Sequence, residues 1–168
     1  MANTQNNLKA AFAGESQANR KYLFFAERAD RDGFPQVARL FRAVAEAETV
    51  HARRQLQTLA DGIGETAKNL ETAIYGELYE STEMYPNFIR QAESENDKAA
   101  QTTFNQAYTV VEIHADLYDK ALQAVKNGKS MKDAPYFVCQ GCGYTVEGNA
   151  PDRCPICGAP LSRFKKVE

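Results

Sequence analysis

Apolar side chains recur at the spacing of an α-helix through the first three-quarters of the chain. In the first helix, for example, Leu8, Phe12, Tyr22 and Ala29 fall on one stripe. The same pattern predicts four helices, over residues 4–31, 35–60, 67–93 and 97–127. Pro86 lies inside the third range and should kink that helix or open a local bulge in it. A mainly α fold follows, with the four helices packed as a bundle over residues 1–130.

The charge balance excludes some classes of partner. The chain has 168 residues, with 20 Lys and Arg against 22 Asp and Glu and a formal net charge of -2. A nucleic-acid partner would need a basic face, so none is expected. No run of about 18 apolar residues exists, so no membrane span or membrane partner is expected. The N-terminal residues lack the basic and apolar regions of a secretory signal, which predicts a cytoplasmic protein.

Carboxylates and histidines occupy positions on these apolar stripes. Burying an ionised carboxylate without a partner costs on the order of several kcal/mol, and a shared metal cation removes that cost. Glu48 and His51 are three residues apart, so they present an oxygen and a nitrogen on one helical face. Interhelical salt bridges, or a helical register that leaves these groups exposed, are the alternatives. The candidate ligands are Glu15, Glu48, His51, Glu77, Glu80 and His114.

The same arrangement occurs twice. Glu15 precedes His51 by 36 residues, and Glu77 precedes His114 by 37 residues. Each predicted helix pair therefore has a Glu on its first helix and a His on its second, as in bundles that bind two metal ions. Four carboxylates neutralise two divalent ions, and mixed oxygen and nitrogen ligation suits iron or manganese.

The four cysteines lie in a short tail. Residues 131–135 read as a linker, and residues 136–168 are too few to fold without a covalent or metal staple. Two Cys-x-x-Cys pairs supply that staple: Cys139, Cys142, Cys154 and Cys157. Four thiolates at this spacing suit zinc or a single iron ion, and a cytoplasmic location disfavours disulfides. The tail is therefore predicted to be a small domain built around one metal ion.

Together these features make the chain similar to the rubrerythrins. The matching stretches are AFAGESQANRKY (11–22), DGFPQVARLF (32–41), EAETVHA (46–52), YGELYESTEMYP (75–86), HADLY (114–118) and the cysteine tail. The resemblance implies a ferritin-like di-iron bundle held by the six candidate ligands, followed by a rubredoxin-like β domain with Fe(Cys)4. It also implies that Glu80 and His51 exchange as ligands with oxidation state, and that Tyr22 and Tyr85 lie beside the irons.

One position departs from the family pattern. The family has a Glu three residues before the last His, and this chain has Val111 there. Glu112 follows at once, but one residue is about 100° around a helix, so it points off the stripe. Either a π-type bulge turns Glu112 inward, or the centre lacks one bridging carboxylate, which is slightly favoured.

The resemblance implies a peroxidase that reduces hydrogen peroxide to water in oxidative-stress defence. Electrons would come through the Fe(Cys)4 site from rubredoxin or an NAD(P)H-dependent reductase, because the chain has no GxGxxG or GxxxxGK nucleotide motif of its own. A ferritin-type ferroxidase, and a zinc-ribbon protein without catalysis, are the alternatives.

Chain geometry predicts a domain-swapped homodimer. The connection between the second and third helices must climb about 28 Å and step sideways about 8–10 Å if both half-sites are to meet in one bundle. Its seven residue steps reach at most about 25 Å. The first two helices of one chain are therefore expected to pair with the last two of another.

Overall fold

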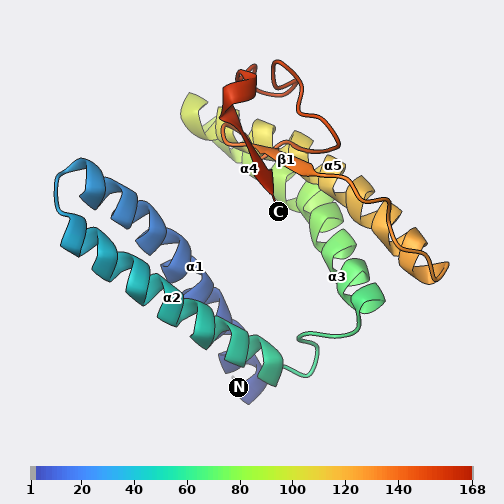
Figure 1. Ribbon diagram of the computed structural model, residues 1–168, viewed down its shortest axis with the longest axis horizontal. Coiled ribbons are helices and arrows are strands. Elements are labelled where there is room, and N and C mark those ends of the chain that lie inside the picture. The colour runs from blue at the N-terminus through green and yellow to red at the C-terminus, as the bar shows by residue number, and fades with distance from the viewer. Residues whose placement is uncertain (1–2, 168) are drawn as a thin grey trace. The chain divides into compact units, whose positions relative to one another are not determined.

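The computed structural model describes residues 3–167, which form two compact units divided between Gly64 and Glu65. The first unit is a helical hairpin. The second contains three further helices and a small sheet (Figure 1).

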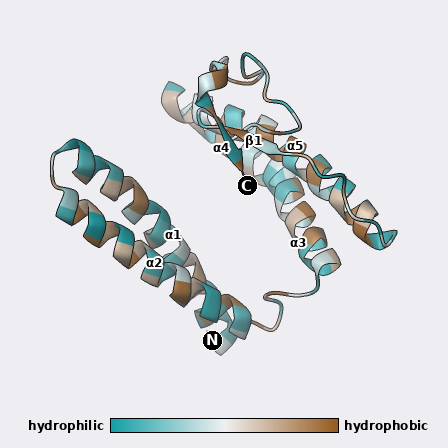
Figure 2. Ribbon diagram, viewed as in Figure 1, coloured by the Kyte–Doolittle hydropathy of each residue, from teal (hydrophilic) through white to brown (hydrophobic). Residues whose placement is uncertain are grey.

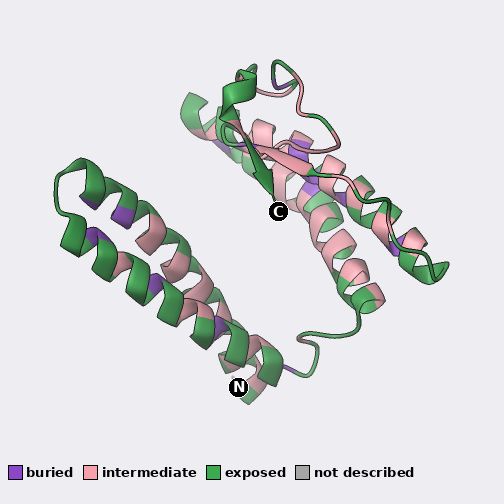
Figure 3. Ribbon diagram, in the orientation of Figure 1, coloured by how far each residue is buried: buried purple, intermediate pink, exposed green. Residues whose placement is uncertain are grey.

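The first unit consists of α1 (Thr4–Arg31) and α2 (Pro35–Thr58), which run antiparallel (Figure 1). Asn3 caps α1 by accepting the backbone N–H of Asn6, and Pro35 begins α2, where a missing N–H costs nothing. The two helices approach closely because the buried side chains between them are small. Those on α2 recur every seven residues, the spacing of a coiled-coil seam, at Ala38, Ala45 and Ala52 (Figure 3).

A tight turn closes the first unit. The α-helix ends at Thr58, two residues before the predicted end, because Leu59 is extended. The N–H of Gly62 then donates to the carbonyl of Leu59. A methyl group built on Gly62 would lie 1.8 Å from the carbonyl oxygen of Leu56, so only glycine fits there.

The third predicted helix is present but is interrupted. It comprises α3 (Thr66–Tyr79), the π-helical segment η1 (Glu80–Met84) and α4 (Tyr85–Ser94). Within η1 the backbone N–H of Tyr85 donates to the carbonyl of Glu80, five residues earlier. Pro86 follows immediately and has no N–H to donate. The predicted local bulge is thus confirmed.

The long helix α5 (Lys98–Lys126) packs along α3, η1 and α4. Asp97 caps it by accepting the N–H of Ala100, and Asn96 turns the chain with a φ of 57°. Tyr85, Phe88 and Phe104 form an aromatic cluster with ring centroids 5.6–6.4 Å apart. This cluster fixes α4 on α5.

The tail folds into a three-stranded antiparallel sheet in the order β2-β1-β3. Its strands are β1 (Tyr136–Cys139), β2 (Thr145–Glu147) and β3 (Phe164–Val167), with the 3-10 turn η2 (Leu161–Arg163) before the last strand. The buried side chains of Cys139 and Cys154 form its centre. A domain this small has a sulfur core where larger ones have an apolar core.

Large apolar side chains remain exposed on both units, and hydrophobic residues recur along the outer faces of the helices (Figure 2). On α2 they follow one stripe, where Val37 is 45% exposed, Leu40 62% and Val44 37%. Among the residues that the structure describes, no helix has the length and apolar character of a membrane span.

Candidate metal centres

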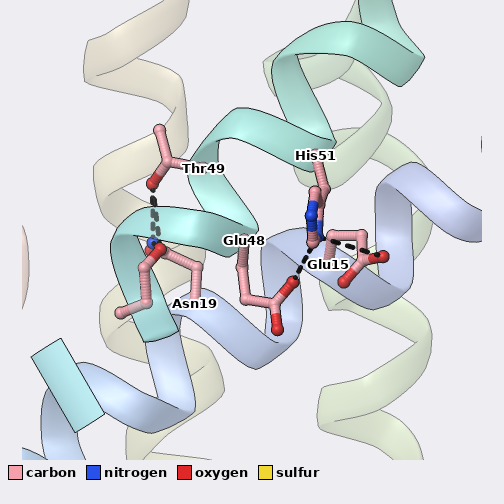
Figure 4. A network of polar contacts seen from close by, with 6 residues as sticks. Glu15, Asn19, Glu48, Thr49 and His51 are labelled. Atoms are coloured by element: carbon pink, nitrogen blue, oxygen red, sulfur yellow. Dashed lines mark hydrogen bonds and ion pairs between the residues drawn. The ribbon is translucent and has the colours of Figure 1, made fainter. Parts of the chain in front are cut away.

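Three candidate ligands meet on the first unit, one from α1 and two from α2 (Figure 4). The Nδ1 atom of His51 lies 3.0 Å from Oε2 of Glu48 and 3.9 Å from Oε1 of Glu15. The spacing of three residues on α2 places Glu48 and His51 on the same side of one helical turn. Glu15, Glu48 and His51 are called the first half-site below.

The first half-site is rich in negative charge. The pKa of Glu48 lies below its ordinary value because its carboxylate accepts a hydrogen bond from the Glu15 carboxyl and another from His51. The Glu15 and Glu48 carboxyl groups thus lie close enough to interact. A divalent cation bound between them would offset their like charge.

Asn19 supports this half-site from α1. Its amide nitrogen donates to the carbonyl of Ala45 at 2.7 Å and to Oγ1 of Thr49 at 2.9 Å (Figure 4). Both acceptors are on the turn of α2 that carries Glu48. The hydrogen bonds fix the two helices in register, so Glu15 and Glu48 face each other. Asn19 lies four residues after Glu15, on the same helical stripe, but the spacing does not identify its partners on α2.

The second half-site is formed by Glu77, Glu80 and His114. Nδ1 of His114 lies 3.4 Å from Oε2 of Glu77, and both side chains are partly buried. The pKa of Glu80 lies above its ordinary value, first because of burial and then because of repulsion by Glu77. Glu80 is thus close enough to interact electrostatically with Glu77. Among the described residues, however, the ligand atoms of Glu77, Glu80 and His114 do not form a cluster of three.

These residues fit a metal better than salt bridges. Among the described residues, none of the ion pairs joins a half-site carboxylate to Lys or Arg. The ion pairs that Glu15, Glu48 and Glu77 do form are with the two histidines. Oxygen and imidazole donors of this kind suit iron or manganese.

Position 111 lacks a carboxylate. The helix α5 is regular through this region, Val111 is 6% exposed and the side chain of Glu112 is exposed. The bulge that would turn Glu112 inward is therefore absent. The other expectation, a centre with one bridging carboxylate fewer, stays a prediction.

The four cysteines of the tail converge on one point. The Sγ atoms of Cys139 and Cys157 are 3.6 Å apart, and those of Cys142 and Cys154 are 3.5 Å apart. All four are free thiols, and their sulfur atoms lie within 4.8 Å of one another. Metal–sulfur bonds of about 2.3 Å in a tetrahedron would separate the sulfurs by about 3.8 Å. The tail is thus shaped for one tetrahedral ion.

Backbone amides support the thiolate form of Cys139. Burial alone raises its pKa, but N–H groups of Gly141 and Cys142, together with the thiols of Cys157 and Cys154, outweigh burial and lower the pKa to about 7. The N–H of Gly141 lies 3.4 Å from the sulfur. Such donors also tune the potential of a metal bound there.

Comparison with known proteins covers nearly the whole chain. The family model described as Rubrerythrin matches residues 6–122, and that described as Rubrerythrin, rubredoxin-like domain matches residues 137–165. The chain is 36% identical to a rubrerythrin of Porphyromonas gingivalis, over 98% of this chain and 90% of the relative. It is 32% identical to Rubrerythrin-2 of Clostridium acetobutylicum, over 98% and 96% respectively.

A solved structure agrees with these matches. Nigerythrin in its fully reduced, all-ferrous state matches with a TM-score of 0.59 and 33% identity, covering 99% of this chain and 88% of that one. The predicted fold class is confirmed: a ferritin-like helical bundle followed by a small rubredoxin-like β domain. The predicted cofactors, two iron ions in the bundle and one in the four-cysteine site, are confirmed by the same findings. The chain therefore belongs to the rubrerythrin family.

Proposed function

We propose that this protein reduces hydrogen peroxide to water in the cytoplasm, as a defence against oxidative stress. Membership of the rubrerythrin family makes it a di-iron protein with a peroxidase-type role. The observation that supports the proposal is the pair of half-sites, each with a histidine Nδ1 beside carboxylate oxygens. Four free thiols arranged for a metal suit a reducing compartment, which supports the cytoplasm.

Ten residues would hold the metals. The two half-sites together would bind the di-iron centre, and Cys139, Cys142, Cys154 and Cys157 would bind the third iron. When bound, the two ferrous ions supply the two electrons that the conversion H2O2 + 2 e⁻ + 2 H⁺ → 2 H2O consumes. The chain itself must bring peroxide, protons and further electrons to that centre.

Tyr85 and Glu80 are suited to handle the protons. Burial raises the pKa of Tyr85 above its ordinary value, and the nearby Glu80 and Glu77 carboxylates raise it further. Tyr85 therefore keeps its proton and can donate a hydrogen bond towards the site. The raised pKa of the Glu80 carboxyl makes it a better proton acceptor than an ordinary glutamate.

Electrons would enter through the tail. The Fe(Cys)4 site accepts one electron at a time, so it must be reduced twice for each peroxide. We propose that a rubredoxin or an NAD(P)H-dependent reductase is the donor, because the chain has no nucleotide-binding motif.

We further propose a domain-swapped homodimer. Each half-site lies beside an apolar surface: Val37, Leu40 and Val44 are exposed on the stripe of α2 that continues to His51. Leu78 and Tyr79, beside Glu77, are about half exposed on α3. A second copy would cover the first unit with its own second unit and so bring complementary half-sites together.

The connection between the units supports the swap. Thr58 and Thr66 are eight residue positions apart, and eight steps reach at most about 29 Å when fully extended. Joining the half-sites within one chain would need a climb of about 27 Å and a sideways step of about 8–10 Å. The connection is not fully extended, because the N–H of Gly62 donates to the carbonyl of Leu59. Its actual reach is therefore shorter than the distance that joining the half-sites within one chain would require.

Anaerobic mixing tests the proposed reaction. Protein purified without oxygen, loaded with ferrous iron and reduced, is mixed with one equivalent of hydrogen peroxide or of dioxygen. We expect peroxide to oxidise the di-iron centre within seconds and to be converted to water without loss of iron. Faster oxidation by dioxygen, with release of ferric iron, would favour the ferroxidase. A colourless zinc-loaded tail and no reaction with peroxide would favour the non-catalytic protein.

A further inference from the structure

One strand of the tail lies along α5 in matching register. A methyl group built on Gly143 would lie 3.8 Å from Cγ1 of Val110, Thr145 contacts His114, and Glu147 forms an ion pair with Lys120. Alternate residues of an extended chain are about 6.6 Å apart, and one turn of an α-helix rises about 5.4 Å. The segment from Gly143 to Glu147 thus contacts α5 at Val110, His114 and Lys120 in order along the helix.

The contact between Thr145 and His114 joins the tail to a proposed iron ligand. Oγ1 of Thr145 lies 3.0 Å from Nε2 of His114. The pair lines a cavity of about 460 Å³ together with Leu117, Tyr118 and Tyr136, where the walls are largely apolar. Restricted access of water strengthens a hydrogen bond in such a place.

A second hydrogen bond of the Thr145 hydroxyl indicates which partner donates in the contact with His114. Oγ1 of Thr145 donates to the carbonyl of Gly143 at 3.0 Å. A hydroxyl has a single proton, and a carbonyl can only accept, so towards His114 the hydroxyl oxygen is an acceptor. With the hydroxyl proton directed to Gly143, the proton between Thr145 and His114 is that of Nε2. In the neutral imidazole Nδ1 then has a free lone pair, and Nδ1 is the nitrogen that faces Glu77.

We propose that Thr145 is a positioning residue for His114: its hydroxyl oxygen accepts the Nε2 proton and holds the ring in the tautomer whose Nδ1 is available to iron. The inference rests on the proposed function, in which His114 is an iron ligand. It adds that the rubredoxin-like domain contributes a side chain to the support of the di-iron centre. The hydrogen bonds Gly143–Thr145–His114 also begin one residue after Cys142, a proposed ligand of the other iron.

The test uses the full-length protein and two substitutions. Thr145→Val keeps the shape of the side chain but removes the hydroxyl, and Thr145→Ser keeps the hydroxyl. Ferrous affinity of the bundle is measured anaerobically by competition with a chelator. Removing a hydrogen-bond partner of a metal-bound histidine typically lowers metal affinity by about 10–100-fold. We therefore expect a loss of that size in the ferrous affinity of Thr145→Val and little change in that of Thr145→Ser.

A second readout does not involve iron. With one equivalent of zinc in the four-cysteine site, ¹⁵N correlation spectra report which nitrogen of His114 bears the proton. We expect a slowly exchanging proton on Nε2 in the wild type and in Thr145→Ser, and loss of that protection in Thr145→Val. An unprotonated Nε2 in the wild type, or a ferrous affinity of Thr145→Val within about twofold of wild type, overturns the proposal.

The two proposals fail in different ways. Wild-type protein that binds ferrous iron but is not oxidised by peroxide contradicts the proposed function and leaves the Thr145 measurements intact. A fully active wild type whose Thr145→Val variant retains its iron contradicts only the role of Thr145. The zinc-loaded spectrum of the tail shows whether each variant is folded.

Discussion

Glu48 and His51 face each other across one turn of α2, with Oε2 and Nδ1 3.0 Å apart. In the second unit, Oε2 of Glu77 and Nδ1 of His114 are 3.4 Å apart, and this pair between two helices corresponds to Glu15 and His51 of the first unit. Each unit thus presents a carboxylate–imidazole pair that is incomplete as a di-iron site. The proposal that two copies complete each other's sites can be tested directly.

Complementation tests the domain swap. Glu48→Gln damages the first half-site and Glu77→Gln the second, so each variant alone should lose peroxide turnover. When the two are unfolded together and refolded, a swapped dimer of the two variants has one intact centre and one doubly damaged centre. Random pairing then restores about one quarter of all centres. Glu48→Gln refolded with Glu15→Gln is the control and should restore none. Its recovery to the same level would contradict the swap.

Val111→Glu should restore a bridging carboxylate. Val111 is buried, so the substitution should destabilise the metal-free protein by about 1–3 kcal/mol. With ferrous iron bound, the variant should regain the lost stability. It should also retain its iron against a chelator for longer than the wild type does. Urea unfolding with and without iron measures both effects. Glu112→Gln, at the neighbouring exposed position, should change neither, and an equal loss of stability in both metal states would count against the missing-ligand interpretation.

Cys154→Ser should separate the two metal sites. Cys154 is buried at the centre of the tail, and a domain of this size cannot fold without its metal. The visible absorption of Fe(Cys)4 should disappear. The reduced di-iron centre should still react once with peroxide, whereas multiple turnover with an electron donor should fall at least tenfold. Undiminished turnover would show that electrons bypass the tail.

Asn19→Ala should weaken the first unit. Its amide joins α1 to the carbonyl of Ala45 and to Thr49, and both bonds are partly buried. Loss of the amide removes both partly buried hydrogen bonds between the helices and should cost about 1–3 kcal/mol in the free energy of unfolding. Gln17→Ala, which removes only an exposed hydrogen bond with Lys21, is the matched control and should cost less than about 0.5 kcal/mol.

The helices and both sets of candidate ligands could be predicted from the sequence because each follows a local rule. Apolar spacing predicts a helix over residues 4–31, and α1 has these same ends. The two Cys-x-x-Cys pairs indicate a metal site without any knowledge of the fold. The assignment of individual ligands and the limits of the two domains stay predictions.

Contacts between distant segments could not be predicted in this way. Thr145 is 31 residues from His114, and neither helical nor strand spacing marks it as a partner. Asn19 lies on the stripe of Glu15 and Tyr22, but its acceptors on α2 are identified only when the two helices are packed together. The sequence indicated a bulge near Pro86, but whether Glu112 would turn inward depended on the backbone of α5, which stays regular.

At the π-turn Glu80–Met84, the stability of the helix and the direction of its side chains make opposing demands on the backbone. Such a turn holds one residue more than an α-turn, and it is retained mostly where a side chain must be aimed. A shortened protein that lacks one residue of this turn should therefore have a straighter and more durable helix. The Glu80 side chain would then point in another direction. Selection for thermal stability would therefore favour the shorter helix, and selection for catalysis would favour the present length.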